Sequence, residues 1–369
     1  LQCQIPAAPF NHPLMSCMTP REGETDYDRA LRVRGWKSAK DFLTPQVPDS
    51  FFVNSRGHKL YVSTWFPDSP KKIRYTLVLL HWYGGHNNLP MKKEFCTKLA
   101  KQGIAVVCYD HEGHGYSEGE RCFIPDAQLL VDDAIQFVDV VYGTTVDGEG
   151  KVDQVLPGPE AMVKRLKEVP FFLAGESLGG GLALAAGLRW QQVPKTSQGW
   201  LPKWRGNVLL APLISGGKRP AAPVLFVLRY VVAPLVPKMQ VPEAVEPLAD
   251  KRAMWAEEEH WDQSVVDTWG QPDGISWGTN NMRFGTGVGM LDFTHKLGQA
   301  APGATFPMLI LHDPADEIVA FGPSEAMETE DHPERQLVRL VGARHDVVSN
   351  QPEKVRVLIT EWMDKRVKG

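Results

Sequence analysis

Five consecutive residues in the middle of the chain have the types and spacing of a serine nucleophile. Residues 175–179 read Gly-Glu-Ser-Leu-Gly, which fits the pattern G-x-S-x-G with Ser177 at its centre. An apolar run precedes the pattern and small residues follow it, which predicts a strand, a strained turn and a helix. The backbone N–H of Leu178 would then lie at a helix N-terminus, where negative charge is favoured. We therefore predict that Ser177 is a nucleophile.

A serine hydroxyl is a weak nucleophile, so it needs a base that a third group orients. After such a turn the expected chain order is serine, then an acid, then histidine. Of the eleven histidines, only His345 follows the last predicted strand in a loop, and we predict it as the base. Four others precede Ser177 in the chain, which is the wrong order: His81, His86, His111 and His114.

The acid has three candidates in the loop that follows a predicted strand at 307–311. Asp313 directly ends that strand, whereas Asp316 lies three residues into the loop and is better placed to reach a neighbouring loop. Glu317 is the third candidate. All three would lie at the carboxyl ends of strands, where open α/β sheets place their ligands.

The elements that would position these residues alternate between strands and helices. Strands are predicted at 76–80, 104–109, 171–174, 207–210, 307–311 and 336–341. Helices are predicted at 91–101, 126–142, 178–190 and 352–366. A hairpin is predicted at 51–66, around Asn-Ser-Arg-Gly. This alternation predicts an α/β fold with a mostly parallel central sheet that is covered by helices on both faces.

The same pattern divides the chain into four segments. Residues 1–48 are predicted as an N-terminal arm, and 49–211 as the first part of the α/β core. Residues 212–303 lack a strand–helix alternation and are rich in Pro, Trp and Met, so we predict an inserted helical cap. Residues 304–369 complete the core.

Composition excludes several classes of protein. The 369 residues carry a net charge of −4 and are 43% hydrophobic, with no basic stripe that would suit nucleic acid. No apolar run reaches the roughly 20 residues of a membrane-spanning helix. The five cysteines are too sparse for a disulfide framework, so we expect a reducing compartment, cytoplasmic or organellar.

The sequence resembles the monoacylglycerol lipase-like branch of the α/β-hydrolases, which includes lysophospholipase-like serine esterases. Residues 110–119 (DHEGHGYSEG) are similar to its loop D-x-x-G-H-G-x-S-x-G, and residues 175–179 match its nucleophile turn in a form typical of plant or algal members. The resemblance spans roughly residues 50–366. It implies that Asp110 and His114 are structural supports beneath the site.

Two further loops match the same branch and assign the triad. Residues 315–319 resemble its acid loop, which favours Asp316 over Asp313, and residues 342–345 resemble its G-x-x-H base loop. The resemblance thus implies a catalytic triad of Ser177, His345 and Asp316 that needs neither a cofactor nor a metal.

The oxyanion hole follows from the same comparison. Residues 81–86 (HWYGGH) occupy the place of the branch's H-G-x-G-x-H, which implies that the N–H groups of Tyr83 and Leu178 bind the oxyanion. Trp82 stands where the branch has glycine. A tryptophan would be strained there if the position required a positive φ.

The implied activity is hydrolysis of carboxylic esters of single-chain lipids, either monoacylglycerols or lysophospholipids, with the cap shaping the acyl pocket. The alternatives are an acyltransferase that uses the same triad and an esterase for small non-lipid esters. A metal site that uses His111 and His114 is disfavoured, because no compact ligand set is evident. The apolar run at 224–236 either builds the cap's own core, which is favoured, or makes peripheral contact with a membrane.

Overall fold

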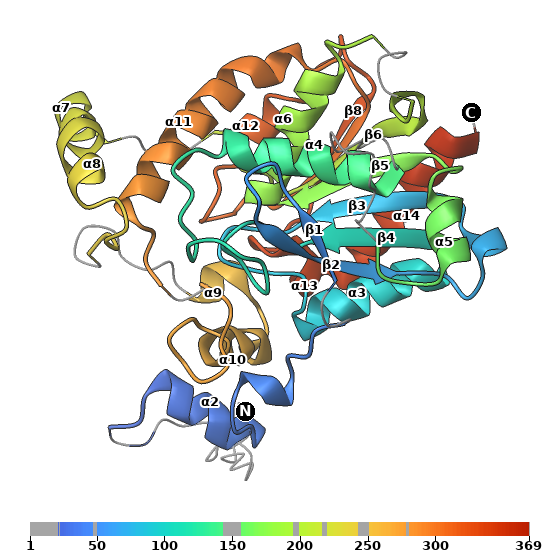
Figure 1. The fold of residues 1–369 in the computed structure, drawn as a ribbon. Helices are drawn as coiled ribbons and strands as arrows, with labels where there is room; N and C mark the ends of the chain where they lie inside the picture. Colours follow the sequence, from blue (N-terminus) through green and yellow to red (C-terminus); the bar gives the residue numbers. More distant parts are fainter. Residues whose placement is uncertain are drawn as a thin grey trace, which may run out of the picture.

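Eight strands form one sheet in the order β1-β2-β4-β3-β5-β6-β7-β8 (Figure 1). The computed structural model describes residue 21 and residues 23–46, 50–142, 156–194, 199–215, 220–242, 251–277 and 280–368. The strands are β1 (Phe51–Val53), β2 (Lys59–Trp65), β3 (Tyr75–Leu80), β4 (Ile104–Tyr109), β5 (Phe171–Glu176), β6 (Trp204–Leu210), β7 (Met308–His312) and β8 (Arg335–Arg339). The predicted α/β class with a mostly parallel sheet is confirmed.

Strand direction follows from the connections. A tight turn joins β1 to β2, in which Gly57 has a φ of 86° and donates its N–H to the carbonyl of Asn54. This turn forces antiparallel pairing, and β2 also pairs antiparallel with β4. The remaining neighbours pair in parallel because helices return the chain to the same edge.

Both faces of the sheet are apolar and both are covered by helices. In β3, Val78 and Leu80 belong to one core cluster, whereas Leu77 and Leu79 belong to the other, as the two-residue strand period requires. Helices α4 (Gln128–Tyr142), α6 (Leu178–Trp190) and α11 (Phe284–Ala300) contribute to the first cluster. Helices α3 (Pro90–Lys101), α13 (Val347–Asn350) and α14 (Pro352–Lys368) contribute to the second. Shorter core helices are η2 (Pro70–Lys72), α5 (Glu160–Leu166), η3 (Leu201–Lys203), η5 (Ala301–Gly303) and α12 (Gly322–Glu325).

The described parts of the insertion between β6 and β7 are mostly helical, with turns and isolated β-bridges within residues 267–283. Its first group of helices lies at the edge of the molecule beside α11 (Figure 1) and comprises α7 (Ala222–Val227), η4 (Leu228–Val232) and α8 (Ala233–Leu235). Its second group comprises α9 (Lys251–Met254) and α10 (Glu258–Val266). The favoured interpretation of the run at 224–236 was wrong, because Phe226 and Leu235 are 61% and 75% exposed instead of packed in a core.

The N-terminal arm packs on the cap. Helix α2 (Asp26–Arg34) lies against α10, and the arm continues through η1 (Ala39–Asp41) toward the core. Buried Arg29 bonds the buried carboxylate of Asp262 in α10 at 2.5 Å. No helix in the described ranges has both the length and the apolar character needed to cross a membrane.

Several strand boundaries differ from those predicted, most clearly in β5, in β8 and in β6, which begins at Trp204 instead of Asn207. β5 continues two residues past Ala174, because Glu176 still pairs with Leu210 of β6 although its side chain is ionisable. β8 begins at Arg335 and ends at Arg339, where the predicted strand ran to Val341. The Gly-rich polar stretch at 143–158, whose composition predicts a loop, lies mostly outside the described residues.

Candidate active site

Ser177 occupies a strained turn between β5 and α6. Its φ of 51° and ψ of −114° are unusual for a residue with a side chain, and its N–H donates to the carbonyl of Leu210 at 2.8 Å. The flanking glycines permit this turn. A Cβ on Gly175 would lie 2.1 Å from the carbonyl oxygen of Gly179, and a Cβ on Gly179 would lie 2.3 Å from that of Leu80. The G-x-S-x-G pattern is therefore explained by close backbone packing.

Ser177 and His345 line the same small cavity. The cavity has a volume of about 10 Å³, which is room for about one water molecule. Trp82, Glu176 and Asp346 also line it. The structure thus brings the predicted nucleophile and the predicted base to one place at the carboxyl edge of the sheet.

His345 is oriented by Asp316. Its Nδ1 donates to Oδ2 of Asp316 at 2.7 Å, which leaves Nε2 as the nitrogen available for a serine proton. Oδ1 of Asp316 accepts the backbone N–H groups of Ile318 and Val319 at 2.8 and 3.0 Å. Burial pushes the pKa of Asp316 upward, but hydrogen bonds from His312 and His345 outweigh it and hold this pKa well below its usual value. Asp316 therefore stays ionised.

His312 is a contributor that the sequence reasoning missed. Its Nε2 donates to the same Oδ2 of Asp316 at 3.0 Å, and its Nδ1 accepts the hydroxyl of Ser324 at 2.8 Å. His312 is the last residue of β7 and precedes Asp316 by four residues. A histidine at a strand end four residues before the acid is the signal that could have revealed it.

The other two acid candidates do not contact His345. Oδ2 of Asp313 accepts the backbone N–H of Arg344 at 2.7 Å, and its Oδ1 accepts that of Ala315 at 3.0 Å. Arg344 has a φ of 56°, so Asp313 stabilises an unusual backbone conformation directly before the base. Glu317 is exposed.

The loop after β3 lies beside the start of α6. Gly179 packs against the carbonyl oxygens of Leu80 and His81, so the nucleophile turn and the predicted oxyanion loop are neighbours. Gly84 has a φ of 79°, whereas Trp82 is not among the described residues with a positive φ. The position of Trp82 therefore does not require a positive φ, and its ring lines the cavity that Ser177 shares.

Two neutral histidines stabilise this loop through hydrogen bonds. Nδ1 of His81 donates to the carbonyl of Trp82 at 2.7 Å, and its Nε2 accepts the N–H of His111 at 2.9 Å. In return, Nε2 of His111 donates to the carbonyl of His81 at 3.0 Å. Burial lowers the pKa of His81 well below its usual value and that of His111 to about 4. Both rings therefore act as uncharged hydrogen-bonding groups.

Residues of the cap also form hydrogen bonds with this loop. The carbonyl of Gly84 accepts the N–H of Trp277 at 2.7 Å and the hydroxyl of Ser276 at 2.8 Å. Nε2 of His86 donates to Oδ2 of Asp267 at 2.7 Å, and both side chains are fully buried. The geometry around the Tyr83 N–H thus depends on core and cap together.

Asp110 and His114 have structural contacts, as the family resemblance implied. Asp110 accepts the N–H groups of Asn87 and Tyr116 at 2.9 and 3.1 Å, and it is fully buried. Nδ1 of His114 donates to the carbonyl of Glu112 at 2.9 Å. Burial lowers the pKa of His114 to about 3.

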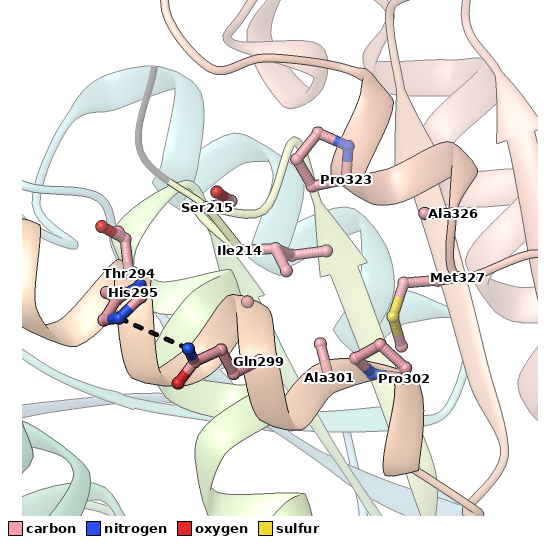
Figure 2. Close-up of a pocket in the computed structure, with 11 residues that line it drawn as sticks. Ile214, Ser215, Thr294, His295, Gln299, Ala301, Pro302, Pro323, Ala326 and Met327 are labelled. Carbon is pink, nitrogen blue, oxygen red and sulfur yellow. Dashed lines mark hydrogen bonds between the residues drawn. The ribbon is translucent and has the colours of Figure 1, made fainter. Parts of the chain in front are cut away.

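Across the described residues, no group of three or more His, Cys, Asp and Glu side chains is arranged to hold a metal ion. A second cavity of about 370 Å³ lies between α11 and α12 (Figure 2). It is lined by Ile214, Ser215, Thr294, His295, Gly298, Gln299, Ala301, Pro302, Pro323, Ala326 and Met327. None of these is a predicted site residue, so this cavity is separate from the one that Ser177 lines.

Comparison with known proteins defines the class. Residues 71–352 match the model of the family described as "Serine aminopeptidase, S33", so the chain belongs to this hydrolase family. Rat (Rattus norvegicus) monoglyceride lipase is 24% identical over 320 residues, which cover 85% of this chain and 90% of the relative. Caffeoylshikimate esterase of Arabidopsis thaliana is 23% identical, covering 86% of both chains.

Solved structures agree on the fold. A soluble variant of monoglyceride lipase from Saccharomyces cerevisiae, in complex with a substrate analog, matches with a TM-score of 0.62 and 19% identity, covering 88% of this chain and 97% of that chain. The predicted resemblance to monoacylglycerol lipase-like α/β-hydrolases is confirmed. The predicted enzyme class, a carboxylic ester hydrolase, is confirmed as well.

Proposed function

We propose that this protein hydrolyses carboxylic esters of single-chain lipids, such as monoacylglycerols or lysophospholipids, through a Ser177-His345-Asp316 triad. The observation that carries the proposal is the strained Ser177 turn beside a histidine whose Nδ1 lies 2.7 Å from a buried carboxylate. The name of the rat relative, monoglyceride lipase, supports the choice of substrate class.

In the first half of the reaction, Ser177 attacks the ester carbonyl and His345 takes its proton through Nε2. Asp316 balances the charge of the imidazolium that forms, because it remains a carboxylate. The N–H groups of Tyr83 and Leu178 stabilise the oxyanion. Each such donor is typically worth about 3–4 kcal/mol of the barrier.

His345 then gives its proton to the leaving alcohol, which yields an acyl-enzyme on Ser177. In the second half, His345 removes a proton from water, and the resulting hydroxide attacks the acyl carbon. Collapse of that intermediate releases the fatty acid and returns the proton to Ser177. No cofactor takes part in the proposed reaction.

The acyl chain needs more space than the closed site offers. A cavity of about 10 Å³ is far smaller than the roughly 300 Å³ or more of an ordinary ligand pocket. Segments of the cap at Ala253 and Trp255 contact the base loop, through His345 and Asp346 respectively. Substrate entry therefore requires these cap contacts to shift.

The same small cavity favours a second candidate, an esterase that acts on small non-lipid esters. The Arabidopsis relative is named for a shikimate ester, which supports the same alternative. An acyltransferase would use the same triad, with an alcohol in place of water. Product analysis with an added alcohol distinguishes transfer from hydrolysis.

The decisive experiment compares wild type with Ser177→Ala on monoacylglycerols, lysophospholipids and short p-nitrophenyl esters. The lipid proposal expects the highest kcat/KM on a single-chain lipid and loss of all activity in the variant. Preference for the short esters would favour the second candidate. Full activity of Ser177→Ala would refute the triad.

Peripheral membrane contact through α7, η4 and α8 is part of the proposal. An apolar surface on these helices is exposed and is formed by Val224, Phe226, Val227, Tyr230, Val231 and Leu235. Such a surface suits the interface of a lipid aggregate that holds the substrate. We also propose a cytoplasmic or organellar location, which the free, buried state of Cys96, Cys108 and Cys122 supports.

A further inference from the structure

A buried ion pair involves the residue that precedes the nucleophile in the chain. Lys92 in the first turn of α3 bonds Oε2 of Glu176, the residue that precedes Ser177. The side chains of Lys92 and Glu176 are only 1% and 7% exposed. Glu176 also lines the small cavity that Ser177 and His345 share.

Lys92 faces the other two parts of the site as well. Its Nζ lies 4.3 Å from the ring centroid of Trp82, the residue before the predicted oxyanion donor. Its positive charge counters the burial of Asp346, the residue after His345, and helps to lower the pKa of that carboxyl. Asp346 in turn accepts Trp255 Nε1 of the cap at 2.9 Å.

We infer that Lys92 is a positioning residue. It fixes the positions of the nucleophile turn, the base loop and the predicted oxyanion loop relative to one another. This inference rests on the proposed function of Ser177 and His345. Each of these two residues has a carboxylate next to it in the chain, and one buried ammonium faces both carboxylates.

Stability alone does not account for such a pair. Apolar residues of similar size commonly stabilise a core as well as, or better than, a buried ion pair does. A directional charge contact does add a fixed geometry, and misplacing catalytic groups by about 1 Å can cost on the order of 100-fold in rate. The position of Lys92 between the three loops is where such precision matters.

The pair also connects the site to pH. Burial raises the pKa of Glu176 to about 7, although Lys92 and His345 oppose this shift. Three charged or titratable groups therefore face Glu176: Lys92 from α3, and His345 and Asp346 from the base loop. The carboxyl of Glu176 therefore changes its charge near neutral pH, next to the buried ammonium of Lys92.

The test measures kcat and KM separately on p-nitrophenyl butyrate for Lys92→Met, Glu176→Gln and the double variant. Lys92→Met is expected to lower kcat by on the order of 10- to 100-fold and to change KM less than about threefold. It should slow labelling by a fluorophosphonate probe to a similar degree. The double variant should regain part of kcat, because no buried carboxylate is left without its cation.

Lys98→Met on the same helix is the matched control, since Lys98 is 39% exposed and pairs at the surface. It should leave kcat unchanged. Glu176→Gln removes a group whose pKa is about 7, so it should change the kcat/KM profile around that pH, an effect that a purely structural role would not produce.

A folded Lys92→Met variant with kcat within about threefold of wild type would overturn the inference, while an inactive Ser177→Ala would leave the proposed function standing. Full activity of Ser177→Ala would overturn both. If Lys92→Met does not fold, Glu176→Gln decides: an unchanged kcat and pH profile would overturn the inference.

Discussion

The imidazole of His345 and the carboxylate of Asp316 are joined by a 2.7 Å hydrogen bond, whereas Asp313, three residues earlier, accepts the backbone N–H groups of Arg344 and Ala315. The two aspartates therefore have different roles, although both follow the same strand. Asp316 orients the base, and Asp313 fixes the backbone that carries it.

We expect Asp316→Asn to lower kcat/KM by about 10³- to 10⁴-fold, because an amide does not stabilise the imidazolium and favours the wrong tautomer. Asp313→Asn keeps one oxygen as an acceptor, so it should lower kcat/KM by less than roughly tenfold. Steady-state kinetics on p-nitrophenyl butyrate measure both. Equal losses would contradict the assignment of the acid.

The arm and the cap share a buried ion pair whose loss should destabilise the protein. Asp262 is fully buried and bonds Arg29 at 2.5 Å and Arg34 at 2.9 Å. Asp262→Ala leaves Arg29 buried without its main partner, so we expect the free energy of unfolding to fall by about 3–5 kcal/mol. Urea denaturation measures it, and Asp273→Ala, at a more exposed arm–cap pair, should have a much smaller effect.

Stability should fall as the pH drops below about 6.5. The pKa of His111 is about 4 and that of His114 about 3, so both are neutral in the native state while the unfolded chain takes up protons. Each histidine therefore lowers the free energy of unfolding by about 1.4 kcal/mol per pH unit as the pH falls from 6.5 toward its native pKa. Above pH 6.5 their contribution is fully present.

Denaturant unfolding between pH 4.5 and 7 tests this slope. His114→Asn keeps a donor for the carbonyl of Glu112 but does not titrate, so the slope should decrease by about 1.4 kcal/mol per pH unit. His295→Gln, at an exposed histidine, should leave the slope unchanged. An unaltered slope in His114→Asn would show that His114 is not the source.

Trp82 should restrict the size of the substrate. Its ring is 8% exposed and lines the cavity beside Ser177. Trp82→Ala is therefore expected to raise kcat/KM for bulky alcohol esters, relative to small ones, by roughly 10-fold or more. Trp269→Ala, at a tryptophan that is 45% exposed, is the control. If the ratio of kcat/KM between bulky and small esters is the same in Trp82→Ala and wild type, Trp82 does not limit the size of the substrate.

The apolar surface of α7, η4 and α8 should bind lipid. Replacing Phe226 and Leu235 with serine is expected to reduce cosedimentation with phosphatidylcholine vesicles by several-fold and to spare activity on soluble esters. Val341→Ser is the control, because Val341 is 75% exposed but lies in the loop after β8. Equal binding by all variants would exclude this surface.

Short-range patterns determined much of what the sequence predicted. The sharp turn at residues 175–179 is marked by its own glycines, and a Cβ on Gly175 would meet only Gly179 and Gly180 among its nearest atoms. The motif, with the strand pattern before it and the helix pattern after it, therefore predicted Ser177, although Gly179 also packs against Leu80 and His81. Chain order and a loop after the last strand singled out His345. Alternation of strands and helices gave the parallel sheet, because helical connections return the chain to the same edge.

Only the tertiary structure separated Asp316 from Asp313 by contact, since both lie within three residues and only side-chain direction distinguishes them. The tertiary structure also showed that His312 forms a hydrogen bond with Asp316 and that Lys92 forms an ion pair with Glu176. It also exposed the apolar surface of α7, η4 and α8, which the sequence favoured as core. These outcomes depend on which elements become neighbours in space, and residue spacing along the chain does not encode that directly.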